Sequence, residues 1–112
     1  MKKIYLAIPY TFNPELAFEV ANKVAAKLMD QGKIVFSPIS HSHPISKYIK
    51  NPQTHDFWMS QDLPMLLTCD ELYLVVIGDN GYQLIENSRG CQEEIETAEI
   101  NQIPIIYYDY DE

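Results

Sequence analysis

The sequence predicts an α/β fold built on a small parallel sheet of four to five strands. Short apolar runs bounded by turn-forming residues recur along the chain, which is typical of strands buried in a sheet. The segments between these runs carry apolar residues at helical spacing. Strands that alternate with helices form parallel sheets joined by right-handed crossovers. We therefore expect a parallel sheet covered by helices.

The N-terminal segment predicts a buried strand followed by a helix. Ile4–Ile8 is an apolar run that Pro9 ends. Asn13 suits the N-cap of a helix and Pro14 suits its first turn, while Gly32 ends it. The helix presents one apolar stripe: Leu16, Ala17, Val20, Ala21, Val24, Ala25 and Leu28.

The next segment predicts a second buried strand and a long loop. The strand is Ile34–Phe36, closed by a Ser-Pro pair that ends at Pro38. Residues 39–54 are rich in turn signals and contain His41 and His43, so they are predicted to form a loop. A loop of this length in a small domain is usually functional.

The central segment predicts a helix, a strand and a polar loop. Residues 57–68 have helical spacing, and Pro64 must start or kink that helix. Residues 71–77 form the most apolar run of the chain and predict the third strand. Residues 78–87 are polar and are predicted to be a loop.

The last segment predicts one more helix and one more strand. The helix begins at Ser88 and runs to about Asn101, and the fourth strand is Ile103–Tyr107. Residues 108–112 have the character of a disordered tail. The whole order predicts a flavodoxin- or Rossmann-like three-layer sandwich formed by a single domain over residues 1–112.

Composition narrows the function classes. The formal net charge is −8, so the chain repels polyanions, and binding to a nucleic acid polymer is not expected. Cys69 and Cys91 are far apart in the sequence and lie beside apolar stretches, which favours reduced, buried thiols. The apolar run after the N-terminal lysines is too short for a signal peptide, and no stretch could span a membrane. We expect a cytoplasmic protein that contacts no membrane.

Ligands of open parallel sheets bind outside the carboxyl ends of the strands. Four turns should therefore share one edge: Ile8–Pro9, Ser37–Pro38, Gly78–Asp79 and Tyr108.

Glu94 is the acid of the last predicted helix that best suits a ligand site. On a helical wheel Cys91, Ile95 and Ala98 face the core, and Glu94 lies at the edge of that buried face. Glu93 and its other acidic neighbours point to solvent. The helix N-terminus lies at the ligand edge, and its dipole favours an ionised Glu94, which suits a nucleophile. The alternative is one more solvated acid.

The start of the same helix has the composition of an anion site. Ser88 is a good N-cap, Gly90 permits close approach, and Arg89 is the only arginine of the chain. A phosphate would suit these groups. The alternative is an ordinary cap with a surface arginine. No P-loop or GxGxxG motif is present, so neither nucleoside triphosphate hydrolysis nor dinucleotide binding is supported.

The remaining candidates each have a structural alternative. Asp62 could cap the turn at Pro64, and Tyr5 could be a core tyrosine whose hydroxyl needs a partner. His43, in the 39–54 loop, and Tyr82, on the ligand-edge loop, are candidate substrate contacts; a solvated histidine and a core aromatic are the alternatives. His41 and His43 form an HxH pair without a third ligand, so no metal or other cofactor is expected.

Three segments occur in an order and spacing that resemble a known family. KIYLAIPY places Tyr5 in the first strand, and QDLPMLLTCDELYLVV holds Asp62 eight residues before Asp70. SRGCQEEIETA has Gly90 four residues before Glu94 and an alanine four residues after it. Over residues 3–107 the chain resembles the nucleoside 2-deoxyribosyltransferase superfamily, including its nucleoside 5'-monophosphate N-glycosidases and a phage-associated branch.

This resemblance implies a site and a mechanism. The glutamate at position 94 attacks the anomeric carbon and displaces the base, forming a covalent glycosyl-enzyme. Asp62 protonates or holds the leaving base, and Tyr5 positions the glutamate. A serine at the position of Ser88 contacts the 5'-phosphate in the hydrolases. Pro9, at the end of the first strand, joins the expected substrate contacts.

The sequence thus predicts cleavage of the N-glycosidic bond of a nucleoside or deoxynucleoside 5'-monophosphate, by hydrolysis or base exchange. A homodimer or larger homo-oligomer is expected from the resemblance. Two alternatives stay open: a non-catalytic nucleotide-binding module, acting as a sensor or sponge, and an interaction protein without a ligand. The base, the sugar and the acceptor depend on pocket shape.

Overall fold

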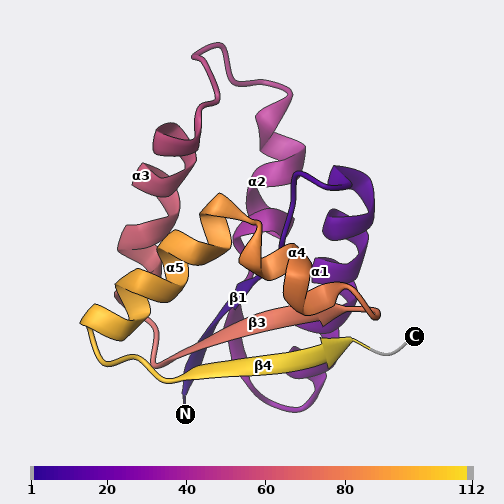
Figure 1. The fold of residues 1–112 in the computed structure, drawn as a ribbon, viewed down its shortest axis with the longest axis vertical. Coiled ribbons are helices and arrows are strands. Elements are labelled where there is room, and N and C mark those ends of the chain that lie inside the picture. The colour runs from indigo at the N-terminus through magenta and orange to yellow at the C-terminus, as the bar shows by residue number, and fades with distance from the viewer. Residues whose placement is uncertain (1, 111–112) are drawn as a thin grey trace.

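A computed structural model describes residues 2–110 and has the α/β architecture shown in Figure 1. Its elements follow in chain order: β1 (Lys3–Ala7), α1 (Pro14–Asp30), β2 (Ile34–Phe36), α2 (Pro38–Ser46), α3 (His55–Leu66), β3 (Glu71–Ile77), α4 (Gly81–Glu86), α5 (Arg89–Ile100) and β4 (Ile105–Tyr110).

The four strands form one parallel sheet in the order β2-β1-β3-β4. Alternate residues of β1 and β3 enter two separate cores, since successive side chains of a strand point to opposite faces. The helix α1 covers one face, and α3, α4 and α5 cover the other (Figure 1). The predicted three-layer sandwich, flavodoxin-like and with a four-stranded sheet, is confirmed.

The helix α1 forms as its sequence predicts. The Asn13 side chain accepts a hydrogen bond from the Leu16 N–H at 3.2 Å, and Pro14 occupies the first turn. The helix is followed by Gly32 at φ +87°, a left-handed conformation that glycine adopts without strain. The stripe is buried except for Leu16, which is 38% exposed.

The prediction of a loop over residues 39–54 is wrong for its first half. Pro38 starts α2, because a proline at the first position of a helix loses no intrahelical hydrogen bond. Pro44 lies inside the helix and leaves one backbone carbonyl without its usual donor. The helix packs against α1 and β1, and this tertiary contact overrides weak local propensity. Residues 47–54 remain irregular.

Two further helices differ from their predicted bounds. Residues 78–87 hold the short helix α4, whose Ile85 enters the core beside β3. The helix α3 begins at His55, two residues earlier than predicted, because the Thr54 hydroxyl accepts from the Phe57 N–H at 3.1 Å. Pro64 lies within α3 and does not start it.

The strands differ in detail as well. The edge strand β2 is not fully buried, since Ile34 is 45% exposed. The strand β4 begins at Ile105 and extends through Tyr110, so residues 108–110 are strand and not tail. Their pairing with β3 supplies the hydrogen bonds that order them. Residues 1 and 111–112, which complete the predicted domain and tail, lie outside the described residues.

Cys69 and Cys91 are both free and buried, as predicted. Within residues 2–110, no helix is long and apolar enough to cross a membrane.

The close approach of α4 to β3 leads to a stability prediction. A Cβ added at Gly81 would lie 2.4 Å from Val76 Cγ1 and 3.0 Å from its carbonyl carbon. We expect Gly81→Ala to cost about 1–3 kcal/mol, seen as a melting temperature lower by several degrees. Gly90→Ala is the control, because its Cβ would meet only Met59 Cε at 3.7 Å. Equal melting temperatures for the two variants would contradict the prediction.

Candidate active site

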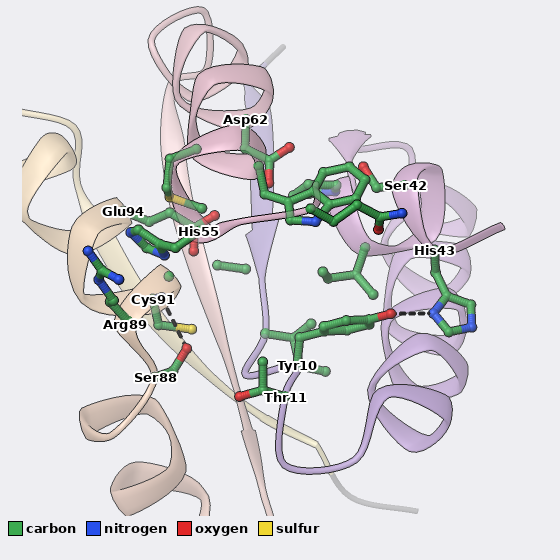
Figure 2. Close-up of a pocket in the computed structure, with 18 of the residues that line it drawn as sticks. Tyr10, Thr11, Ser42, His43, His55, Asp62, Ser88, Arg89, Cys91 and Glu94 are labelled. Carbon is green, nitrogen blue, oxygen red and sulfur yellow. Dashed lines mark hydrogen bonds between the residues drawn. The ribbon is translucent and has the colours of Figure 1, made fainter. Parts of the chain in front are cut away.

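A pocket of about 480 Å³ opens where the chain leaves the carboxyl end of β1. Ala7, Ile8, Tyr10 and Thr11 supply that side of the pocket, while α2, α3 and the N-terminal turn of α5 enclose it (Figure 2). It lies beside the boundary between β1 and β3, where the chain reverses the direction in which it adds strands. Ligands of doubly wound folds bind at such a point. Pro38 also lines the pocket, whereas residues 78, 79 and 108 do not.

Glu94 lines this pocket and is only 5% exposed. Its Oε2 accepts a hydrogen bond from the Tyr5 hydroxyl. Its Oε1 has no hydrogen-bond partner among the described residues. Every buried side-chain oxygen there has a partner, so Oε1 is not buried and is open to the pocket. Burial raises the pKa of Glu94 to about 8, against the opposing effect of the Tyr5 bond. Burial thus opposes the ionised form of Glu94 that the helix dipole was expected to favour.

Tyr5 lies beneath Glu94 on β1 and is fully buried. It does not line the pocket, and its hydroxyl reaches Glu94 from the sheet side. Burial raises the pKa of Tyr5 well above its usual value, and the neighbouring carboxyls of Glu94 and Asp62 raise it further. The hydroxyl thus keeps its proton and donates a hydrogen bond to Glu94.

Asp62 enters the pocket from α3 and is 8% exposed. Its carboxyl has no hydrogen-bond partner among residues 2–110, and by the same reasoning both oxygens are open to the pocket. It does not cap the turn at Pro64, which was the structural alternative. Burial raises the pKa of Asp62 to about 6. Asp62 is close enough to Glu94 for its charge to raise the pKa of Glu94.

The predicted anion site lies at one end of the same pocket. The Ser88 hydroxyl accepts from the Cys91 N–H at 3.2 Å and caps α5. Ser88, Arg89 and Gly90 all line the pocket, so the helix N-terminus and the only arginine face one space (Figure 2). An anion site requires a helix N-terminus, a positive charge and a space for the ligand, and all three occur here.

His43 lies at the opposite end of the pocket, on α2 (Figure 2). Its Nδ1 is 2.7 Å from the Tyr10 hydroxyl and its Nε2 is 3.1 Å from a carboxylate oxygen of Glu15. Its ring stacks on Phe18 with centroids 4.3 Å apart. Glu15 and Phe18 thus fix the His43 ring, and the ring in turn positions the Tyr10 hydroxyl at the pocket.

Two predicted contacts do not belong to the pocket lining. Pro9 lies between Ile8 and Tyr10, which line it, but contributes no lining atom. Tyr82 is 58% exposed on α4 and packs against Tyr107, with ring centroids 5.5 Å apart. Because residues 81–86 form a helix, Tyr82 is turned away from the ligand edge.

The sequence reasoning missed His55, the first residue of α3. Its Nε2 is 2.7 Å from Glu93 Oε1, and its ring lines the pocket. Glu93, predicted to point to solvent, is therefore half-buried. The spacing of His55, Met59 and Asp62 places all three on one face of a helix, and this signal would have found His55 had the helix been extended to Thr54.

Among residues 2–110, no group of three or more His, Cys, Asp and Glu side chains is arranged to hold a metal ion.

The fold defines a class, the proteins that share the 2-deoxyribosyltransferase fold. The solved structure of a 2-deoxyribosyltransferase from the psychrotolerant bacterium Bacillus psychrosaccharolyticus superposes with a TM-score of 0.65. It is 21% identical, and the match covers 96% of this chain and 72% of the other. The resemblance stated from the sequence is confirmed at the level of the fold.

The family follows from the sequence itself. The model of the family described as "Domain of unknown function (DUF1937)" matches residues 2–110, and the chain belongs to this family. The comparison with curated proteins returns no match.

Proposed function

We propose that the protein cleaves the N-glycosidic bond of a nucleoside 5'-monophosphate, with Glu94 as the nucleophile. The observation that carries this proposal is the arrangement of two buried carboxyls around one pocket. Glu94 has one oxygen held by Tyr5 and the other open, while Asp62 is unpartnered among the described residues. Glycosyl transfer with retention uses a pair of carboxyl groups in two roles, and this pair fits them.

The residues that line the pocket suit a nucleotide in one orientation. The 5'-phosphate would bind the N-terminal turn of α5, where Ser88 and Arg89 supply donors and positive charge. The sugar would then lie over Glu94 and the base would extend toward Asp62 on α3. The similarity in fold to a 2-deoxyribosyltransferase supports a nucleoside as the partner.

In the first step the open Oε1 of Glu94 forms a bond to the anomeric carbon, and the carbon–nitrogen bond breaks. The base leaves with that electron pair and takes a proton from Asp62. The product is a glycosyl ester of Glu94. Water or a second base then attacks the same carbon, and the ester electron pair returns to Glu94. The attacking group loses one proton and Asp62 regains one, so both outcomes regenerate the enzyme.

This step requires an ionised Glu94 and a protonated Asp62. Their pKa values of about 6 and about 8 mean that the pair holds one proton between those pH values. The productive arrangement has the proton on Asp62 and none on Glu94. A hydrogen bond from protonated Asp62 to a nitrogen of the base favours that arrangement in the complex.

The test is a chromatographic assay for free base. The protein is incubated with a panel of ribo- and deoxyribonucleosides and their 5'-monophosphates, with and without an acceptor base. We expect base release that is faster with monophosphates, and none with Glu94→Ala. Release only from nucleosides would contradict the role of the α5 N-terminus, and no release from any member would contradict the enzymatic function.

The bond from Tyr5 to Glu94 leads to a prediction about pH dependence. Because this bond lowers the pKa of Glu94, its loss in Tyr5→Phe raises that pKa above about 8. The form with an ionised Glu94 and a protonated Asp62 becomes rarer, so kcat/KM should fall about 10- to 100-fold at pH 7. The alkaline limb of the pH profile of kcat/KM should move to higher pH.

Tyr73→Phe is the matched control, because Tyr73 lies on β3 and its ring stacks on Tyr108, away from the pocket. A loss of activity in Tyr5→Phe with an unmoved alkaline limb would show that Tyr5 acts only through packing.

The second candidate is a nucleotide-binding module without catalysis. It is favoured by the raised pKa of Glu94, since a carboxyl that is protonated at neutral pH can donate a hydrogen bond to a ligand. A module would show stabilisation by nucleotides in thermal melts but no base release. Glu94→Gln, which keeps a donor, would then bind as well as the parent.

A further inference from the structure

His55 and Glu93 form a hydrogen-bonded pair that the steps above do not use. The pair joins the first residue of α3 to α5, with Nε2 and Oε1 2.7 Å apart. The His55 side chain is 16% exposed and lines the pocket. Glu93 precedes Glu94 in the chain, so the pair lies immediately beside the proposed nucleophile.

The hydrogen-bond partner decides which nitrogen of His55 is available. A carboxylate only accepts, so Nε2 carries the hydrogen that it donates to Glu93. In the neutral ring this leaves the lone pair on Nδ1. Nδ1 has no partner among the described residues, and every buried side-chain nitrogen there has one, so Nδ1 is accessible to solvent.

The position of His55 corresponds to the sugar and not to either end of a bound nucleotide. Figure 2 shows its ring beside Glu94, between Asp62 on one side and Arg89 with Ser88 on the other. In the orientation proposed above, the base lies toward Asp62 and the phosphate lies at Arg89. His55 lines the pocket between these two ends, where the sugar would lie.

We propose that His55, oriented by Glu93, is the general base that activates a water molecule to release the sugar from Glu94. This inference rests on the proposed function and extends it, because it selects water as the acceptor. A carboxylate that fixes the tautomer of a histidine and stabilises the imidazolium is the arrangement by which imidazoles act as bases in hydrolases.

The second step is then balanced as follows. The water oxygen forms a bond to the anomeric carbon, and the bond from that carbon to the Glu94 oxygen breaks. The ester electron pair returns to Glu94, and one water proton moves to Nδ1 of His55. Glu93 stabilises the resulting imidazolium. His55 then returns the proton to solvent, and the free sugar phosphate leaves.

His55→Gln tests this role while preserving the contact with α5. The amide of glutamine can still donate to Glu93 but has no basic nitrogen. With a 5'-monophosphate as substrate, we expect a rapid burst of about one base per site, followed by turnover about 10²- to 10⁴-fold slower. Intact-protein mass spectrometry should show the sugar phosphate retained on the variant and not on Glu94→Ala.

Added azide distinguishes the loss of the general base from damage to the rest of the site. Azide is a nucleophile that needs no deprotonation, so it should react with the glycosyl-enzyme and restore much of the turnover of His55→Gln. Glu93→Gln should show the same pattern more weakly, about 10-fold, because a neutral amide orients the ring but stabilises the imidazolium less. His41→Gln, an exposed histidine outside the pocket lining, is the control and should match the parent.

The outcomes separate this inference from the function on which it rests. If the parent releases base and His55→Gln slows the burst as much as the turnover, or raises KM alone, His55 does not act in the second step and the inference is overturned. A lower melting temperature without adduct would assign the pair a structural role and also overturn it. If the parent releases no base from any substrate, the proposed function itself fails.

Discussion

Glu94→Gln is expected to abolish turnover, with a loss of about 10⁴-fold or more in kcat, while nucleotide binding is retained. Removing a nucleophile costs this much because the covalent route is closed, not merely slowed. The glutamine can still accept the Tyr5 hydrogen bond, so the fold of the pocket floor is preserved. Base release and equilibrium nucleotide binding, measured on the same preparation, check the two parts.

Glu96→Gln is the matched control, since Glu96 is exposed on the same helix and the substitution makes the same chemical change. Its turnover should match that of the parent. Full activity of Glu94→Gln would remove the central assumption of the mechanism. A loss of binding as large as the loss of turnover would instead show that Glu94 mainly holds the ligand.

The second large effect is on stability, which should fall as the pH rises from about 5 to 9. The pKa of Glu94 is about 8 in the folded chain against an ordinary value of 4.5, and that of Asp62 is about 6 against 3.8. Between these values the folded state binds more protons than the unfolded state, so the free energy of unfolding decreases with pH. The contribution is fully present below the unfolded pKa values and is lost as the pH rises through the folded ones.

Each pH unit in the interval between the two pKa values of Glu94 removes up to about 1.4 kcal/mol. Glu94→Gln should therefore melt several degrees higher than the parent at pH 9, and the difference should shrink toward pH 5. Thermal melts of the parent, Glu94→Gln and Glu96→Gln across this pH range provide the comparison. A parent whose stability rises with pH would show that Glu94 is ionised in the folded state.

A parent that melts below Glu94→Gln at pH 9 would reveal a conflict between stability and function at this position. A carboxyl buried for chemistry is more costly to the fold than a neutral amide of similar shape. The protein keeps an acid where the folded state alone would favour an amide.

Local signals in the sequence were sufficient for the four strands and for α1, α3 and α5. The helix α5 was predicted with its cap at Ser88, because the capping hydrogen bond and the apolar spacing are properties of neighbouring residues. The strands β1 and β3 were predicted from their apolar runs, and the parallel sheet followed from their alternation with helices. The α2 helix was missed, because its prolines and serines have weak helical propensity and its packing on α1 compensates.

The contrast between local signals and tertiary packing applies to the site as well. The sequence by itself determined the order of the strands and of α1, α3 and α5, the capped N-terminus of α5 and the residue types that could carry the chemistry. Only the tertiary structure decided which acids are buried: Glu94 lies over Tyr5 and Asp62 faces the pocket, whereas Glu93 meets His55. These pairs join residues far apart in the chain, and burial, which sets their charge, depends on every segment packed around them.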